Sequence, residues 1–144
     1  MDEKEELIQK HIFQYLFSER EFKFEYNQIG FNLYRKIGCL IEKELKNGLV
    51  QISNIENVIN RLIEEKIILK KYDENSTQNG IITLVDSPTI QEYAIEKGYI
   101  TTKVLIDYIN RKYSKTIDMF LLQFKRIQGL DKDLEFQKKE CQIK

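Results

Sequence analysis

Apolar residues recur along residues 52–64 with the spacing of a single helix face. Ser53 or Asn54 can cap the first turn of this helix. Two β-branched runs follow it, KIILKKY and GIITLV, and they flank the polar stretch DENSTQN, which is rich in turn formers. The pattern therefore predicts an amphipathic helix followed by two short strands and a solvated loop. The apolar helix face consists of Ile55, Val58, Ile59, Leu62 and Ile63.

The first 50 residues predict two more helices with an extended piece between them. Residues 3–18 have an unusually broad apolar face, and Phe22, Phe24 and Tyr26 then alternate with charged residues, as in a short half-buried strand or an extended link. A second stripe begins after Gly30 and ends at a stop formed by residues 47 and 48, Asn and Gly. Residues 49–52 could be a short strand. The second stripe consists of Leu33, Ile37, Leu40, Ile41 and Leu45.

Beyond residue 86 the pattern is entirely helical. Pro88 starts a short helix that runs through Lys97 to a turn at Gly98. Thr101 or Thr102 can cap the next helix, whose apolar stripe continues to residue 127 with an interruption near Ser114. A glycine at position 129 is expected to separate a last amphipathic piece, residues 130–136.

This order of elements, with a helix directly before a hairpin, is typical of a winged helix. The predicted fold is mainly α, a winged helix-turn-helix with a small β-hairpin wing and additional C-terminal helices. Residues 1–86 would form the winged-helix core with its N-terminal helix. Residues 87–144 would form a C-terminal extension, either a second helix-turn-helix or dimerisation helices, within one compact unit.

The composition and the charge of the chain limit the classes of partner that can be expected. The chain has 144 residues, 42% of them hydrophobic, which is enough for one compact domain or two very small ones. Its 23 basic and 23 acidic residues balance to zero, which argues against a non-specific nucleic-acid coat. Residues 97–128 nevertheless hold seven bases against two acids, so this part is better suited to a polyanion.

Cysteine usage and hydropathy point to an intracellular protein, either cytoplasmic or nuclear. Cys39 and Cys141 suggest neither a disulfide framework nor a metal site. No run approaches the ~20 apolar residues of a membrane span, and the acidic start MDEKEE is unlike a signal peptide. We therefore expect no membrane, metal or cofactor among its partners.

The helix before the hairpin is the first candidate for reading DNA, since this helix enters the major groove in many winged helices. Asn57, Asn60 and Arg61 suit base or phosphate contacts, whereas Glu56, Glu64 and Glu65 would be repelled by phosphate. The hairpin loop has no Arg or Lys at its tip, which leaves Lys70 and Lys71 at its base as phosphate anchors.

A second candidate covers residues 89–113, which resemble a helix-turn-helix. Ala94 is the small residue where two helices would cross, Gly98 makes the turn, and Val104 is the apolar position of the second helix. Lys97 and Asp107 depart from the pattern, which has apolar residues at their positions. Together the two candidates give the predicted DNA-binding residues: Lys70, Lys71, Thr102, Lys103, Asn110, Arg111, Lys112 and Lys115.

The order of three helices, a hairpin and long C-terminal helices resembles the MarR-like winged-helix regulators. The local likeness is carried by IENVINRLIEEKIILKK followed by GIITL. The resemblance implies a homodimer built by the first helix and residues 115–136, with paired helices meeting successive half-sites of double-stranded DNA. The loop departs from the Asp-x-Arg element common in such wings, because it has Asp73 but no arginine.

No residue set indicates an enzyme. His11 is the only histidine and lies beside Ile12 in the first helix, and the sequence has neither a glycine-rich phosphate loop nor a Cys/His cluster. The preferred hypothesis is a DNA-binding regulator or a DNA-binding accessory subunit of a complex. The alternative is a protein-interaction adaptor with no nucleic-acid contact, which the eight aromatic residues from Phe13 to Tyr34 also favour.

Overall fold

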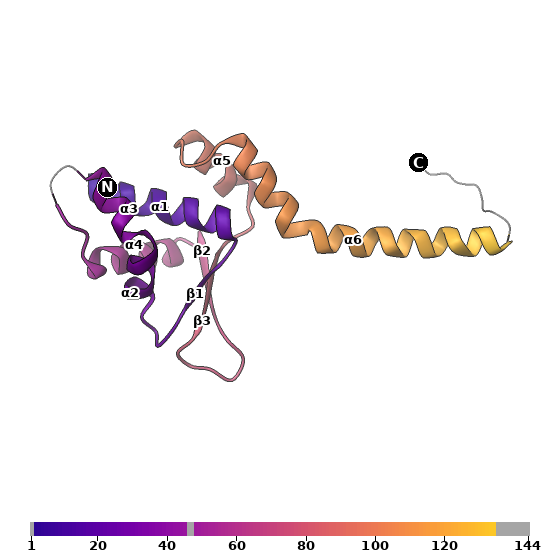
Figure 1. The fold of residues 1–144 in the computed structure, drawn as a ribbon, viewed down its shortest axis with the longest axis horizontal. Coiled ribbons are helices and arrows are strands. Elements are labelled where there is room, and N and C mark those ends of the chain that lie inside the picture. The colour runs from indigo at the N-terminus through magenta and orange to yellow at the C-terminus, as the bar shows by residue number, and fades with distance from the viewer. Residues whose placement is uncertain (1, 46–47, 135–144) are drawn as a thin grey trace. The chain divides into compact units, whose positions relative to one another are not determined.

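The computed structural model describes residues 2–45 and 48–134, with side chains described through residue 114 and at 118 and 121–123. This part of the chain is mainly helical and has one small three-stranded antiparallel sheet (Figure 1). The elements in chain order are α1 (Glu3–Glu19), β1 (Phe22–Phe24), α2 (Ile29–Leu33), the π-helical turn η1 (Tyr34–Gly38), α3 (Cys39–Glu44), α4 (Ile52–Glu64), β2 (Ile68–Tyr72), β3 (Gly80–Leu84), α5 (Pro88–Glu96) and α6 (Thr102–Leu134).

The chain divides into two compact units, Met1–Tyr108 and Ile109–Lys144. The first unit contains the sheet and all the helices through α5, together with the first two turns of α6. Residues 87–108, which the sequence assigned to a C-terminal extension, belong to this first unit. Within the part of the chain that the structure describes, the second unit consists of the remaining turns of α6.

Helix α1 is the centre of the first unit, and its surroundings explain its broad apolar face. It packs against α3, α4 and β3, so different sides of the helix are covered by different elements. Phe13 also lies 5.2 Å from Tyr99 between ring centroids, and Phe17 lies 4.9 Å from Tyr108. Its N-terminus is capped by Asp2, whose Oδ1 accepts a 2.8 Å hydrogen bond from the backbone N–H of residue 5. The buried apolar residues of α1 are Ile8, Ile12, Phe13, Leu16 and Phe17.

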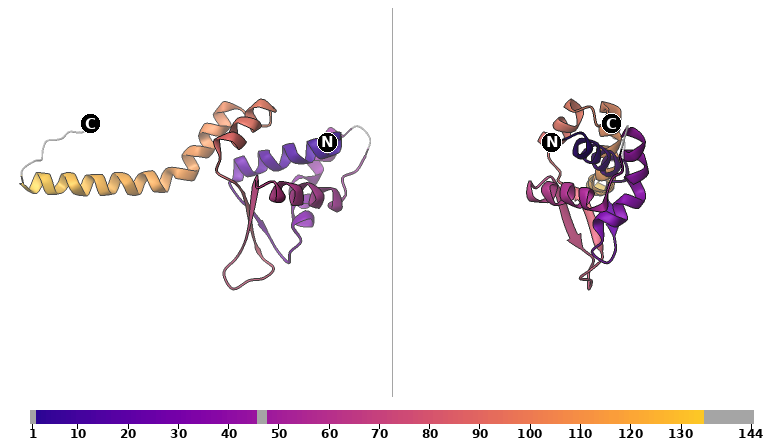
Figure 2. Two further views of the ribbon diagram at one scale, coloured as in Figure 1. Left: turned by 180° about the vertical axis from the view of Figure 1, so that it is seen from behind. Right: turned by 90° about the vertical axis from the view of Figure 1, so that its left-hand side faces the viewer.

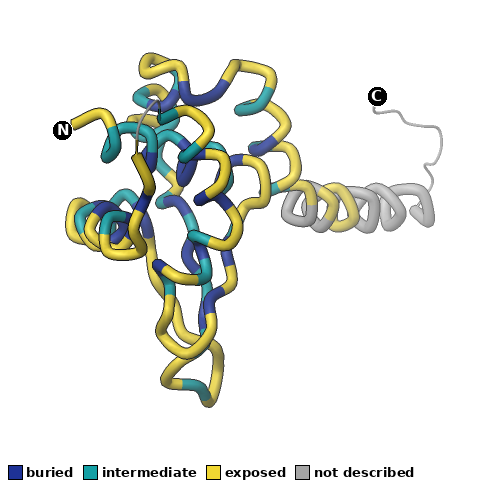
Figure 3. Tube along the Cα trace, turned by 60° about the vertical axis from the view of Figure 1, so that its left-hand side comes forward, coloured by how far each residue is buried: buried dark blue, intermediate teal, exposed yellow. Residues whose placement is uncertain are grey.

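The sheet has the strand order β1-β3-β2, so β1 and β2 are both edge strands. Phe22 pairs with Ile82 and Phe24 with Gly80, and these residues bury one face of the sheet. The hairpin of β2 and β3 projects beyond the helices to an exposed loop (Figures 2 and 3). The alternation of Phe22 and Phe24 was therefore a strand, as expected, whereas Tyr26 lies beyond it and is 66% exposed.

The predicted second helix is interrupted by η1. Leu33, Ile37 and Ile41 are buried, but Leu40 is 48% exposed because the wider π-helical turn changes the angular register of the residues after it. Helix α3 ends at Glu44; of the expected stop, residue 47 lies outside the described residues, and Gly48 has a φ of +147°. The interpretation of one regular stripe was wrong at Leu40.

The structure corrects three further details. Residues 49–52 are not a strand, because α4 begins at Ile52, and its first turn is held by Gln51, whose N–H donates to Asn54 Oδ1 at 2.9 Å. Ser53 is therefore not the N-cap, and Asn54 acts from inside the first turn. The backbone of α6 continues without a break past Ser114 and Gly129 to Leu134. The cap of α6 is Thr101, whose Oγ1 accepts a 3.2 Å bond from Val104 N–H.

Candidate functional site

The exposed face of α4 is polar and carries both amide and carboxylate side chains. The buried face packs on α1, α2 and β2, which turns the opposite face to solvent. Asn57 and Asn60 lie one turn apart on that face, and an amide side chain can bond an adenine edge through two hydrogen bonds. Glu56 and Glu64 are exposed beside them, so the face has hydrogen-bonding capacity without positive charge.

The close packing of α2 on α4 positions this face. Gly30 of α2 is buried, and a Cβ built there would lie 2.2 Å from Cγ of Glu56. A larger residue at this position would therefore require the side chain of Glu56 to move.

Arg61 is turned into the fold and does not lie on the exposed face. Its Nη2 donates a 2.8 Å hydrogen bond to Oε1 of Gln9 in α1, and Nη1 donates to Glu65 at 3.4 Å. Gln9 is only 2% exposed. From the sequence, Arg61 was considered suitable for a DNA contact; the structure commits Nη2 of its guanidinium to a core residue instead.

The hairpin loop, residues 73–79, is braced by hydrogen bonds of its own and by the loop between β1 and α2. Within the loop, Oγ of Ser76 accepts from the N–H of Asn79 at 2.9 Å. From outside, Asn27 donates its N–H to the carbonyl of Gln78 at 2.7 Å and Nδ2 to that of Thr77 at 3.1 Å. The loop contains two acids and no base. The loop is thus held in place by hydrogen bonds, but it offers no lysine or arginine side chain that could enter a nucleic-acid groove.

Lys70 and Lys71 are both exposed but lie on opposite faces of β2. Lys70 pairs with buried Ile82, and its Nζ lies 5.5 Å from the ring centroid of Tyr72. Lys71 pairs with Ile81, which in turn pairs with Lys23 of β1. Because side chains alternate across a strand, Lys71 and Lys23 flank Ile81 on the outer face of the sheet. The structure therefore places the two predicted phosphate anchors on opposite faces of β2.

The segment 89–113 forms two helices joined by a tight turn. Ala94 is fully buried, Gly98 has a φ of +77°, and Val104 is half-buried, as the pattern predicted. The turn is fixed to α1, because Nε2 of Gln9 donates to the hydroxyl groups of Tyr93 and Tyr99, at 3.0 Å each. The short segment thus has the expected local geometry, and its polar contacts lie toward the core.

The remaining sequence-predicted residues divide between the two units. Thr102 and Lys103 are exposed in the first unit. Asn110 and Arg111 are exposed in the second unit, where Lys112 is half-buried. The side chain of Lys115 lies outside the described part of the chain. All of these residues belong to one continuous helix, α6.

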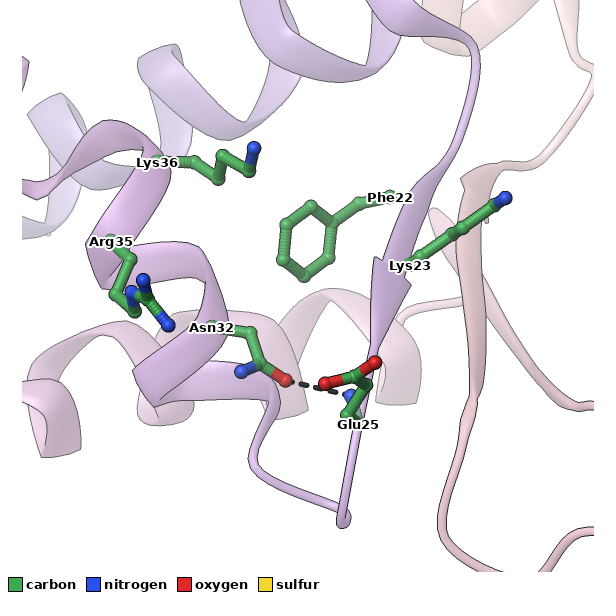
Figure 4. A pocket seen from close by; sticks show the side chains of 6 residues that line it. All are labelled: Phe22, Lys23, Glu25, Asn32, Arg35 and Lys36. Carbon is green, nitrogen blue, oxygen red and sulfur yellow. Dashed lines mark hydrogen bonds between the residues drawn. The ribbon is translucent and has the colours of Figure 1, made fainter.

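A cleft of mixed charge between β1 and η1 was missed by the sequence interpretation. Two adjoining cavities of about 300 and 320 Å³ share Phe22, Lys23 and Lys36. Figure 4 shows the first of them: Phe22 forms its floor, Lys36 extends toward it from η1, and Lys23 is directed away. Arg35 and Asn32 complete the wall on the side of α2 and η1, and Glu25 lines the end of β1. Only the fold brings these residues together, because they come from separate segments.

His11 is a structural residue. It is 9% exposed, and its Nε2 bonds Oε1 of Glu44 in α3, which also accepts a 3.0 Å bond from Lys10. Hydrogen bonds from His11 and then from Lys10 hold the pKa of Glu44 below its usual range. Across the described residues, no group of three or more His, Cys, Asp or Glu side chains could hold a metal ion. No described helix is both long and apolar enough to cross a membrane.

Comparison with protein-family models, with curated proteins and with solved structures finds no match to this chain.

Proposed function

We propose that this chain is a winged-helix protein that binds double-stranded DNA inside the cell, as a regulator or as a DNA-binding accessory subunit. The observation that carries the proposal is the order of α1, β1, the helical segment α2-η1-α3, α4 and the β2-β3 hairpin, together with the sheet order β1-β3-β2. This arrangement places α4 before the hairpin and turns its polar face outward. The MarR-like resemblance remains a proposal on the same elements, and we propose no enzymatic activity.

In the proposed complex, the amide groups of Asn57 and Asn60 contact base edges. Glu56 and Glu64 on the same face repel phosphate but can accept hydrogen bonds from cytosine, so α4 contributes selectivity more than affinity. Phosphate contacts then come from cations elsewhere, which include Lys71 on the outer sheet face. Thr102, Lys103, Asn110, Arg111, Lys112 and Lys115 of α6 are retained as proposed DNA contacts.

The second unit supports a homodimer in this proposal. An isolated helix is marginally stable in water even at the length of several turns, so a long helix needs a packing partner. Leu121 and Leu122 are 46% and 52% exposed, which leaves apolar surface on the described part of this unit. A second copy of the chain would cover such surface and present two α4 helices to two half-sites.

The test is a titration of the purified chain against mixed-sequence duplex DNA at two salt concentrations, with fluorescence anisotropy as the readout. The mass of the protein in solution is measured in parallel by light scattering. The proposal predicts salt-sensitive binding by a dimer. Replacing both Asn57 and Asn60 by alanine should reduce discrimination between duplexes, whereas the exposed α5 variant Glu92→Ala serves as the matched control. Absence of binding at low salt would contradict the proposal.

The second candidate function is a protein-interaction adaptor, and one observation favours it. The exposed residues of α4 and the hairpin loop carry four acids, Glu56, Glu64, Asp73 and Glu74, and no exposed lysine or arginine balances them within α4 or the loop. Such a face is better suited to a basic protein surface than to phosphate. If the DNA titration shows no binding, the adaptor becomes the leading hypothesis for the function of this chain.

A further inference from the structure

The free edge of β1 faces the cleft beside η1. Glu25 donates its N–H to Oδ1 of Asn32 at 2.8 Å on the α2 side, and Tyr26 donates its N–H to Oδ1 of Asn79 at 3.0 Å on the hairpin side. Successive residues of an extended chain direct their backbone groups to opposite edges. Lys23 lies two residues before Glu25, so its N–H and C=O point to the same edge as the N–H of Glu25, toward the cleft and away from β3.

The cleft follows this edge and has the shape of a groove. The two cavities adjoin at Phe22, Lys23 and Lys36, and they extend from Glu19 and Glu21 before β1 to Glu25 and Asn32 after it. Buried Phe22 supplies an apolar floor. A groove along the unpaired edge of a sheet is the geometry in which an extended peptide adds a strand.

The charges along the groove differ between its two ends. Arg35 and Lys36 are exposed on η1, and Lys36 makes no ion pair with any described residue. Arg35 lies 5.9 Å from the ring centroid of Phe31, with its guanidinium beside the Asn32 end. Glu19 and Glu21 line the opposite end. An occupant would therefore be acidic toward Arg35 and basic toward Glu19.

We propose that this groove binds an extended, mixed-charge segment of a partner protein, which pairs with β1 at Lys23 and places acidic side chains against Arg35 and Lys36. The interaction is separate from DNA binding through α4. The π-helical turn is what presents both cations to the strand edge, and such turns are frequent at functional sites. The proposal would make the chain a connection between DNA and a second protein.

The probe is an acetylated and amidated peptide, Thr-Glu-Val-Glu-Val-Lys, with a second peptide of reversed order for the other strand direction. Each is titrated into the full ¹⁵N-labelled chain and followed by amide NMR shifts. We expect at least one of the two to give saturable shifts centred on Lys23, Arg35 and Lys36. If neither peptide does so, or if the shifts centre elsewhere, the proposal is wrong.

Two changes distinguish strand addition from charge attraction. N-methylation of the alternate amides on the peptide edge that would pair with β1 removes the backbone donors of that edge but keeps the charges, and should weaken binding at least about tenfold. Equal binding of the methylated peptide would overturn the strand pairing. Lys36→Glu should also weaken binding about tenfold, whereas Lys43→Glu on the exposed surface of α3 should not, with thermal unfolding confirming that both variants fold. A short DNA duplex that shifts these amides when neither peptide does would assign the cleft to phosphate and contradict the proposal.

Discussion

The face of α4 and the cleft beside β1 differ in how the sequence encodes them. The face of α4 comes from one helix, so the apolar positions that bury one side also define the polar side. The cleft joins residues of β1 with residues of η1, and no local period relates them. A site built on one element can be anticipated from its periodicity, whereas a site between elements depends on the packing that brings them together.

The largest expected effect comes from removing the packing of α4. Leu62 is fully buried, so Leu62→Ala should lower the free energy of unfolding by about 2–5 kcal/mol. The measurement is urea denaturation, with the exposed neighbour Glu64→Ala as the control. A loss below about 1 kcal/mol would place this helix outside the core and undo the basis for its polar face.

Gly38→Ala tests the other region. A Cβ at Gly38 would lie 2.4 Å from Cδ1 of Tyr34, so the ring must move and η1 must adjust. Overpacking costs about 1–3 kcal/mol, and the better helix propensity of alanine offsets up to about 1. We expect a net loss of about 1–2 kcal/mol by calorimetry, and weaker binding of the peptide probe. Cys39→Ala at the adjacent exposed position is the control. Unchanged stability in Gly38→Ala would mean that the ring of Tyr34 can move aside without disturbing η1.

Tyr99→Phe tests the polar cluster that joins α1 to the turn before α6. The hydroxyl donates to Oε2 of Glu6 and accepts from Nε2 of Gln9, so its loss should cost about 1 kcal/mol. Chemical denaturation gives this value, and Tyr26→Phe at an exposed position should be neutral. A neutral Tyr99→Phe would show that the two partners find other hydrogen bonds.

Acid should destabilise the chain through two carboxyl groups. Hydrogen bonds from Tyr99 lower the pKa of Glu6, and those from His11 lower the pKa of Glu44, both from an ordinary value of 4.5. Since the folded pKa lies below the unfolded one, the stabilisation is complete above about pH 4.5 and is lost as the pH falls through the lower folded pKa. The melting temperature should therefore decrease as the pH is lowered below this value. In Tyr99→Phe, the share of this decrease that is due to Glu6 should be smaller. A pH-independent melting temperature in this range would contradict the account.

The smallest effect is expected at Lys71. Lys71→Ala should reduce the salt dependence of DNA binding by about one unit of slope if it contacts one phosphate. Lys43→Ala on α3 provides the control. An unchanged slope for Lys71→Ala would remove the outer sheet face from the DNA interface.

The sequence predicted those elements that have a clear periodicity of apolar residues or a residue that marks where the element begins or ends. The faces of α1 and α4, the two hairpin strands, and the helix starting at Pro88 were all confirmed. Leu40 was misplaced because a π-helical turn shifts the register, which no apolar pattern indicates. The contact of Arg61 with Gln9 was not predicted, because Gln9 lies in a different helix.

The candidate sites show the same division. The exposure of Asn57 and Asn60 follows from the buried face of α4 and was anticipated. The opposite orientations of Lys70 and Lys71 follow from strand alternation once the register with β3 is known. Arg35 and Lys36 carried no signal, because their role depends on the distance from η1 to β1.

The central claim is that the polar face of α4 contacts DNA, and amide NMR of the ¹⁵N-labelled chain with a mixed-sequence duplex tests it most directly. The account predicts saturable shifts in residues 53–60, which weaken as salt is raised. If the duplex binds but leaves the α4 amides unchanged, or does not bind at low salt, then α4 is not a DNA-reading helix and the claim is wrong.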